Sequence, residues 1–153
     1  MFSELSQTLS KEISKSDKKK DGIYFTPSNY IKQLYNIIKS HLPNKDDLLV
    51  LEPSCGSCEM IDYLLKQKDD SKKFKIKGIE LNDTIFKKIN ELKKSEYKNI
   101  ELVHGDFLRH NYDIVNNDDE DDNEEYDNDI DEIEKGKYDL IIGNPPFFVM
   151  KND

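Results

Sequence analysis

The chain has 153 residues, of which 35% are apolar and 36% are charged, and its formal net charge is −9. This length allows one compact domain. No run of 18 apolar residues occurs, so we expect no transmembrane helix. The first residues lack the apolar core of a secretion signal, so we expect an intracellular protein that is not secreted. The only cysteines, Cys55 and Cys58, lie three positions apart, which excludes a disulfide framework.

The acidic residues are concentrated in one stretch. Between Asp113 and Glu134 there are 13 acidic residues and no lysine or arginine. The rest of the chain holds 19 acidic against 23 basic residues, a net charge of +4. We therefore interpret residues 113–135 as an acidic, disordered insertion, which either is inert or repels the phosphates of a nucleic acid. Residues 1–22, where lysines follow a short apolar pattern, are expected to be a flexible or partly helical leader.

Helical and extended patterns alternate from Pro27 onward. Proline suits the first position of a helix and Thr26 can cap it, so a helix is expected to start at Pro27, in a segment that Pro43 and Asn44 end. Further helices are expected over residues 59–67 and after a cap at Asn82 or Asp83. Strands are expected over residues 48–51, 74–80, 100–103 and 138–142. This alternation predicts an α/β fold with a mostly parallel sheet and flanking helices.

Each predicted strand is followed by polar residues or by a turn of small residues. In an open parallel sheet, ligands bind beyond the carboxyl ends of the strands. The four segments that follow the strands begin at Glu52, Glu80, His104 and Gly143. Because parallel strands end at the same edge, we expect these segments to form one binding site.

The second of these segments indicates a nucleoside. Glu80 lies 24 residues beyond Gly56, where an acidic residue can accept hydrogen bonds from the ribose hydroxyls of a nucleoside. The turn after the first strand has neither a complete G-x-G-x-x-G pattern nor a P-loop lysine. It therefore suits close approach of the backbone to a ligand better than it suits ATP.

Five short motifs carry a resemblance to a known family. They are Tyr24-Phe25-Thr26-Pro27, Leu51-Glu52-Pro53-Ser54-Cys55-Gly56, Gly78-Ile79-Glu80-Leu81-Asn82, Gly105-Asp106-Phe107-Leu108 and Asn144-Pro145-Pro146-Phe147. In this order they resemble the motifs of S-adenosylmethionine-dependent amino methyltransferases, especially N6-adenine DNA methyltransferases that place F-T-P first. The resemblance implies a Rossmann-like methyltransferase fold. It makes residues 23–153 a partial catalytic domain, the N-terminal portion only, which stops after the fourth strand.

The resemblance assigns the catalytic role to Asn144, Pro145, Pro146 and Phe147. The Asn144 side-chain oxygen and the Pro145 carbonyl would accept the two N–H bonds of the exocyclic amine of adenine and aim its lone pair at the methyl donor. Pro145 and Pro146 would stiffen the turn. Phe147 would stack on an extruded base.

The resemblance also assigns the cofactor-binding residues. Glu80 would bind the ribose of S-adenosylmethionine, Asp106 would bind the adenine amino group, and Phe107 would pack near that ring. The methionine end would lie beside Thr26 and Pro27. The turn of motif I completes the predicted set with Glu52, Pro53, Cys55 and Gly56. The chain departs from the family pattern at Cys58, where many relatives have glycine.

The implied function is transfer of a methyl group to the N6 amine of adenine in DNA. Two alternatives share the motifs: methylation of RNA adenine or of a protein glutamine amide, and a non-catalytic cofactor-binding subunit. DNA is the expected partner. The resemblance also implies a partner chain or a further portion of the protein that supplies the remaining strands and target recognition, so the isolated chain is expected to have little activity.

The sequence leaves one unrelated interpretation. Cys55-Gly56-Ser57-Cys58 follows a strand and precedes a helix, as a thioredoxin-type redox centre does. That interpretation leaves the other three strand ends unexplained. Two cysteines without further ligands do not complete a zinc site, so we expect no metal. The histidines, His41, His104 and His110, are scattered, and we interpret them as surface or turn residues.

Overall fold

The computed structural model describes residues 2–20, 22–67, 73–96, 99–110 and 137–145. Its helices are α1 (Glu4–Glu12), α2 (Lys15–Lys20), α3 (Ser28–Ile38), the 3₁₀ turn η1 (Lys39–His41), α4 (Glu59–Leu65), α5 (Asp83–Glu96) and α6 (Phe107–His110). Its strands are β1 (Asp47–Glu52), β2 (Lys73–Glu80), β3 (Ile100–His104) and β4 (Leu140–Ile141). The predicted insertion at 113–135, Pro146 and Phe147 lie outside the described residues.

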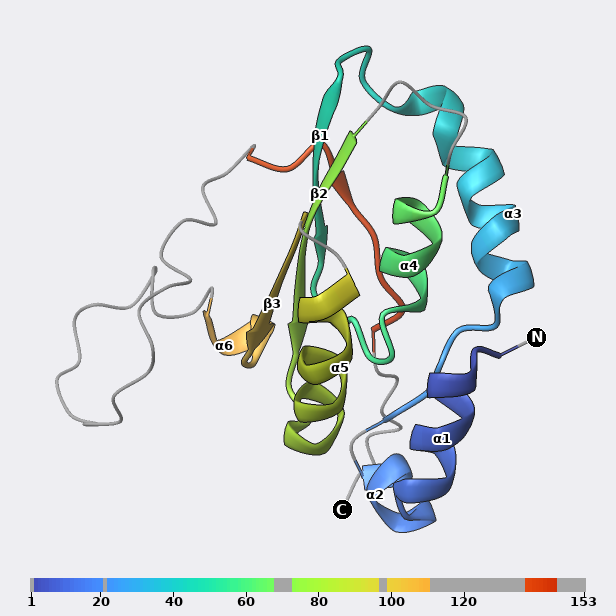
Figure 1. Ribbon diagram of the computed structural model, residues 1–153, viewed down its shortest axis with the longest axis vertical. Coiled ribbons are helices and arrows are strands. Elements are labelled where there is room, and N and C mark those ends of the chain that lie inside the picture. The colour runs from blue at the N-terminus through green and yellow to red at the C-terminus, as the bar shows by residue number, and fades with distance from the viewer. Residues whose placement is uncertain (1, 21, 68–72, 97–98, 111–136, 146–153) are drawn as a thin grey trace, which may run out of the picture.

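The four strands form one parallel sheet in the order β3-β2-β1-β4 (Figure 1). Val50 of β1 is in register with Ile76 of β2 and with Leu140 of β4, and Ile76 is in register with Ile100 of β3. The predicted parallel α/β fold is therefore confirmed. β4 is shorter than the strand expected over 138–142. Hydrogen bonds from the backbone N–H groups of Asp139 and Ile142 to carbonyls of β1 nevertheless continue the pairing on both sides of it.

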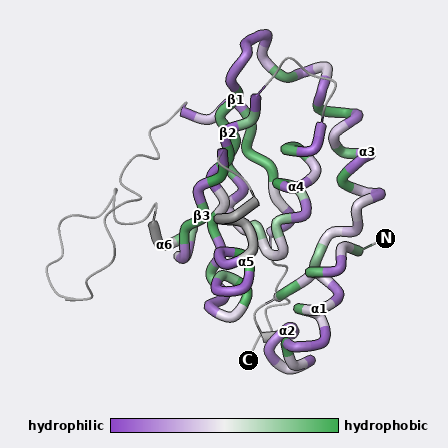
Figure 2. The backbone as a smooth tube through the Cα atoms, viewed as in Figure 1, coloured by the Kyte–Doolittle hydropathy of each residue, from purple (hydrophilic) through white to green (hydrophobic). Residues whose placement is uncertain are grey.

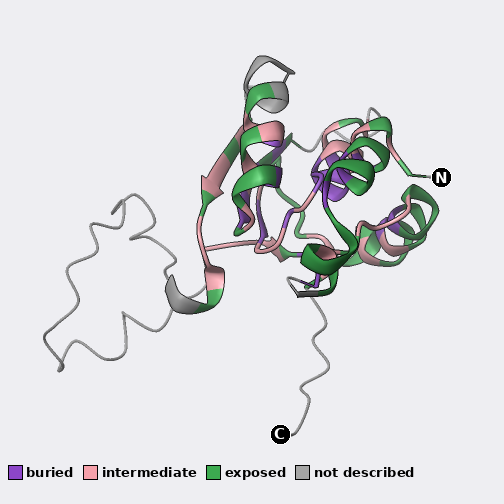
Figure 3. Cartoon of the chain, turned by 90° about the horizontal axis from the view of Figure 1, so that it is seen from below, coloured by how far each residue is buried: buried purple, intermediate pink, exposed green. Residues whose placement is uncertain are grey.

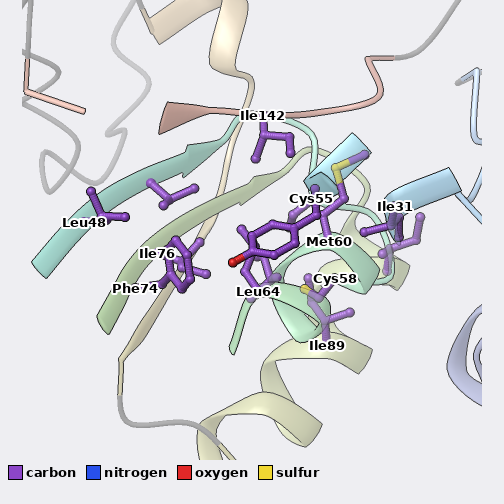
Figure 4. Packing of buried hydrophobic residues seen from close by; sticks show 14 of the residues in the cluster. Ile31, Leu48, Cys55, Cys58, Met60, Leu64, Phe74, Ile76, Ile89 and Ile142 are labelled. Carbon is purple, nitrogen blue, oxygen red and sulfur yellow. The ribbon is translucent and has the colours of Figure 1, made fainter. Parts of the chain in front are cut away.

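The main core lies between the sheet and the helices on one of its faces. In β2, Phe74 and Ile76 are buried while Lys73 and Lys75, which alternate with them along the strand, are exposed, so successive side chains point to opposite faces. Helices α4 and α5 contact β2 on the buried side, and α3 packs outside α4 (Figures 1 and 4). Figure 2 shows the matching hydropathy, with β1 mainly hydrophobic, and Figure 3 shows buried residues gathered in β1, β2 and α4.

The N-terminal segment is attached to this core. The predicted leader, residues 1–22, contains α1, capped by Ser3, and α2. Leu9 of α1 is fully buried, and both Leu9 and Ile13 belong to the same apolar cluster as β1. Figure 1 shows α1 and α2 at the end of the sheet where β1 and β2 terminate. The predicted boundary at residue 22, between the leader and the partial catalytic domain, stays a prediction.

The start of α3 differs from the prediction by one residue. The helix begins at Ser28, and Pro27, in an extended conformation, is its cap residue without a side-chain capping bond. The Thr26 hydroxyl therefore does not cap the helix; it accepts a hydrogen bond from Asn144 instead. The cap predicted for the later helix is confirmed at Asn82, whose side-chain oxygen accepts the Ile85 N–H at 3.1 Å. Within the described ranges, no helix has the length and apolar character needed to cross a membrane.

Candidate functional site

The carboxyl ends of β1 and β2 meet around Glu80, the last residue of β2. Gly56, in the turn after β1, has φ +51, a conformation that suits glycine. In this conformation its N–H donates to Glu80 Oε2 at 2.8 Å, and the N–H of Asn82 donates to Glu80 Oε1 at 2.8 Å. The carboxylate is thereby fixed at the sheet edge by two backbone N–H groups.

Glu80 is buried, with 8% of its surface exposed. Burial raises the pKa of Glu80, and the hydrogen bonds from the Asn82 and Gly56 backbones oppose that rise, as does the neighbouring His104. Each oxygen of the Glu80 carboxylate accepts one hydrogen bond from a backbone N–H and can accept another from a second donor. The arrangement suits a ligand with neighbouring hydroxyl groups.

A small hollow opens beside this turn. It is lined by Phe25, Thr26, Glu52, Cys55, Gly56 and Asn144, together with neighbouring residues of the turn and of α4. Within the part of the chain that the structure describes, three residues that line the hollow each carry a buried oxygen without a hydrogen-bond partner: Glu52 Oε2, Ser54 Oγ and Glu59 Oε2. Buried polar atoms normally have a hydrogen-bond partner, so these three oxygens indicate a binding site for a ligand that carries hydrogen-bond donors.

Glu52 gives the hollow its electrostatic character. The side chain is 3% exposed, and burial, followed by the neighbouring Cys58 and Glu80, raises the pKa of Glu52 well above its usual value of 4.5. A buried carboxylate is stabilised in its ionised form by a positive charge in contact with it. The hollow therefore favours a cationic donor such as an ammonium group.

The structure joins the first and last of the five motifs. Asn144 Nδ2 donates to Thr26 Oγ1 at 3.2 Å and to the Tyr24 carbonyl at 3.4 Å, across 118 and 120 positions of sequence. Since the amide nitrogen is engaged in this way, the amide oxygen remains as the acceptor that the side chain can offer.

The other predicted site residues take different positions. Pro53 lies against Gly143, the residue before Asn144, and Pro145 is exposed after it. Asp106 accepts the Leu108 N–H at 3.0 Å, and Phe107 starts α6. Asp106 and Phe107 do not line the hollow; they lie at the end of β3, next to Glu80 at the end of β2.

Three further residues at this edge were not assigned a role from the sequence. Leu81 and Leu108 are 63% and 78% exposed, and each follows one of the acidic residues Glu80 and Asp106 in its motif. His104, interpreted from the sequence as a surface or turn residue, bonds the Leu81 carbonyl through Nε2 at 3.1 Å, and its ring stacks on Phe86 at 4.9 Å. Exposed apolar side chains beside carboxylates suit a planar ring that carries polar groups at its rim.

The cysteines do not form a reactive pair. Both thiols are free and buried. A hydrogen bond with Cys58, and then burial, raise the pKa of the Cys55 thiol well above its usual value, whereas a redox thiol needs a lowered one. Cys58 adopts the left-handed conformation at φ 61 and packs in the core without lining the hollow (Figure 4). It therefore occupies the backbone conformation that glycine would supply. Over the described ranges, no cluster of three or more potential metal ligands occurs.

Comparison with known proteins gives a consistent result. A family model described as N-6 DNA Methylase matches residues 1–153. The chain is 30% identical over 156 residues to the modification methylase CviBIII of Paramecium bursaria Chlorella virus NC1A, covering 99% of this chain and 34% of that protein. It is 28% identical over 144 residues to the type II methyltransferase M.AccI of Acinetobacter calcoaceticus, covering 94% of this chain and 21% of that protein. The chain thus spans about a third or less of these relatives.

A solved structure shares the fold. It comes from Listeria monocytogenes and is assigned to the class I S-adenosylmethionine-dependent methyltransferases. The TM-score is 0.61 at 14% sequence identity, and the match covers 93% of this chain and 36% of that one. The sheet described above is therefore the Rossmann-like sheet of that fold.

Proposed function

Since the chain belongs to the N-6 DNA methylase family, we propose that it carries the cofactor site and the catalytic asparagine of an enzyme that methylates the N6 amine of adenine in DNA. The methyl donor in this proposal is S-adenosylmethionine. The observation that supports it best is the bond from Asn144 to Thr26 beside a hollow of unpaired buried acceptors.

The residues present fit this cofactor. Its ammonium group would meet the unpaired Oε2 of Glu52, and its ribose hydroxyls would donate to Glu80, which Gly56 and Asn82 hold in place. Its adenine ring would lie between the exposed Leu81 and the end of β3, near Asp106 and Phe107. When bound, S-adenosylmethionine supplies an electrophilic methyl group on a sulfonium.

The chain's own groups would then position the target amine. Asn144 is held by Thr26 and Tyr24 through its amide nitrogen, so its side-chain oxygen is available to accept an N–H of the amine. The Pro145 carbonyl would accept the other. Two acceptors in a fixed geometry localise the nitrogen lone pair and need no strong base, which is catalysis by orientation and electrostatic preorganisation. The roles of Pro146 and Phe147 stay predictions from the motif.

Calorimetric titration with S-adenosylmethionine tests the cofactor site. We expect Glu80→Ala to reduce the affinity at least about tenfold, because the substitution removes charge-assisted hydrogen bonds of about 1.5–3 kcal/mol. Glu101→Gln, at an exposed glutamate of the neighbouring strand, is the matched control and should bind as the unaltered chain does. Equal affinities for all three chains would overturn the assignment of Glu80.

A methyl-transfer assay separates the substrate classes. DNA, RNA and a glutamine-containing protein are each offered with the chain in excess, and the products are identified by mass spectrometry. Because the isolated chain is expected to have little activity, we expect only a small amount of N6-methyladenine, formed in DNA. We expect Asn144→Ala to abolish it while cofactor affinity is retained. A methylated RNA or glutamine product would replace the proposed substrate. Cofactor binding without transfer to any of the three would favour the non-catalytic subunit.

A further inference from the structure

A buried polar network connects α1 to the turn between β1 and α4. Its three central residues are Ser6 of α1, Ser57 of the turn and Glu59 at the start of α4, which are 1%, 3% and 8% exposed. The Ser6 hydroxyl donates to Glu59 Oε1 and lies 2.7 Å from the Ser57 hydroxyl. The backbone N–H of Ser3 donates to the same Glu59 oxygen at 2.9 Å.

The proton positions in this network follow from counting donors. A serine hydroxyl has one hydrogen and two lone pairs. Ser6 gives its hydrogen to Glu59, so Ser57 must be the donor in the bond between the two serines. Ser3 Oγ donates to Ser6 Oγ at 3.1 Å and fills the second lone pair. The Ser6 hydroxyl is therefore fully used, and its removal leaves both Ser57 and Glu59 with a lost partner in the protein interior.

The network leads directly to the cofactor site. Ser57 follows Gly56, whose N–H fixes Glu80, and Glu59 is one of the residues that line the hollow, as Glu52 is. Neither Ser6 nor Glu59 belongs to the five motifs. A buried hydrogen-bond network with every hydroxyl satisfied favours one geometry of the elements that it joins. Here those elements are the N-terminal helix and the turn that carries the ligand-binding backbone.

We infer that Glu59 is a positioning residue which, through Ser6 and Ser57, lets α1 hold the turn at residues 53–58 in its binding conformation. This inference rests on the proposed function for the identity of the ligand. The loop geometry that α1 imposes can be measured without any ligand. A turn that is held in its bound shape loses less conformational entropy when the ligand binds, so the network increases affinity by preorganisation.

Four variants of the chain test the inference. Ser6→Ala and Glu59→Ala remove the network, Glu59→Gln keeps an oxygen that can accept the bonds from Ser3 and Ser6, and Thr8→Ala alters an exposed residue of the same helix. We expect Ser6→Ala and Glu59→Ala to weaken S-adenosylmethionine binding about tenfold, because a buried group that loses its partner costs about 1–3 kcal/mol. Thr8→Ala should bind as the unaltered chain does, and Glu59→Gln should restore most of the affinity lost in Glu59→Ala.

Hydrogen exchange without ligand gives the second readout. The backbone amides of residues 54–59 should exchange faster in Ser6→Ala than in Thr8→Ala, while those of β2 stay unchanged. Unchanged exchange at the turn in Ser6→Ala would overturn the inference. This readout does not depend on Glu59→Ala, so it still applies if that variant fails to fold. Affinity that falls equally in Glu59→Gln and Glu59→Ala would overturn it too, because the charge and not the network would then matter. Failure of the unaltered chain to bind S-adenosylmethionine would count against the proposed function, and the exchange experiment would still decide on the network.

Discussion

Glu52 is a residue at which stability and binding are expected to oppose each other. Its carboxylate is buried with one oxygen unpaired in the described part of the chain, and its pKa is raised well above 4.5. A raised pKa means that folding favours the protonated form, so this residue lowers the stability of the fold as the pH rises above about 4.5. A cationic ligand would reverse that effect by pairing with the ionised form.

We therefore predict that Glu52→Gln stabilises the ligand-free chain at pH 7 by about 1–3 kcal/mol, because a neutral amide of similar shape removes the cost of either burying the carboxylate charge or protonating it. The gain should shrink towards pH 4, where Glu52 is protonated in both the folded and the unfolded chain. Urea unfolding at the two pH values measures it. The same variant should bind S-adenosylmethionine more weakly. A gain of equal size at both pH values would contradict the role of ionisation, and Glu101→Gln controls for the loss of one negative charge.

At the scale of elements, the packing of α4 against β2 depends on Gly78. A Cβ at this position would lie 2.8 Å from Ile61 Cδ1, 3.0 Å from Leu102 Cδ2 and 3.3 Å from Cys55 Cβ. We predict that Gly78→Ala destabilises the fold by about 1–3 kcal/mol, because the added methyl group overpacks a close contact. The Ile61 methyl group is the end of a flexible side chain and can turn away, whereas Cys55 Cβ is fixed to the backbone.

Gly143→Ala is the matched control for this prediction. A Cβ there would meet the Pro53 ring at 3.4 Å, which is ordinary contact, so the midpoint of urea unfolding should change little. A comparable loss of stability in both variants would show that the effect comes from glycine replacement in general and not from the close packing of β2 with α4.

The elements themselves were largely predictable from the sequence, whereas the contacts between distant segments were not. The apolar run at Leu48–Leu51 and the cap at Asn82 are local signals, and both predicted the correct element. Thr26 was predicted to cap a helix because the sequence shows only its neighbours; the structure shows that its hydroxyl accepts a bond from Asn144. Residues 1–22 were predicted to be a flexible or partly helical leader because lysines follow a short apolar pattern, and that local pattern does not reveal that Leu9 packs into the core.

The candidate site was predictable to a similar extent. Glu80 was identified from its position at the end of a strand, and the structure places it at the expected edge with Gly56. Glu59 was missed because a glutamate near the start of a helix is usually a solvated residue that favours the helix dipole. Only the three-dimensional contact with Ser6, more than 50 positions away, distinguishes it. Such long-range polar pairs leave no periodic signal in a single sequence.

At the scale of the whole molecule, the distribution of charge bears on the proposed binding of DNA. The chain carries −9 in total, but +4 without the 13 acidic residues between Asp113 and Glu134. In the sequence this stretch separates the end of β3, where Asp106 lies, from β4, which leads to Asn144. Charges of one sign near a binding edge lower the local concentration of a like-charged partner, and salt screens this effect over a Debye length of about 10 Å at 0.1 M.

We predict that changing these 13 residues to asparagine and glutamine strengthens binding of an adenine-containing DNA duplex several-fold at low salt, with the difference decreasing as salt is added. Fluorescence anisotropy over a salt series measures it. Replacing the stretch by a short glycine–serine linker also gives +4 but changes the length, so agreement between the two variants would assign the effect to charge. Affinities equal to that of the unaltered chain at every salt concentration would instead support an inert insertion, because an electrostatic effect cannot be independent of ionic strength.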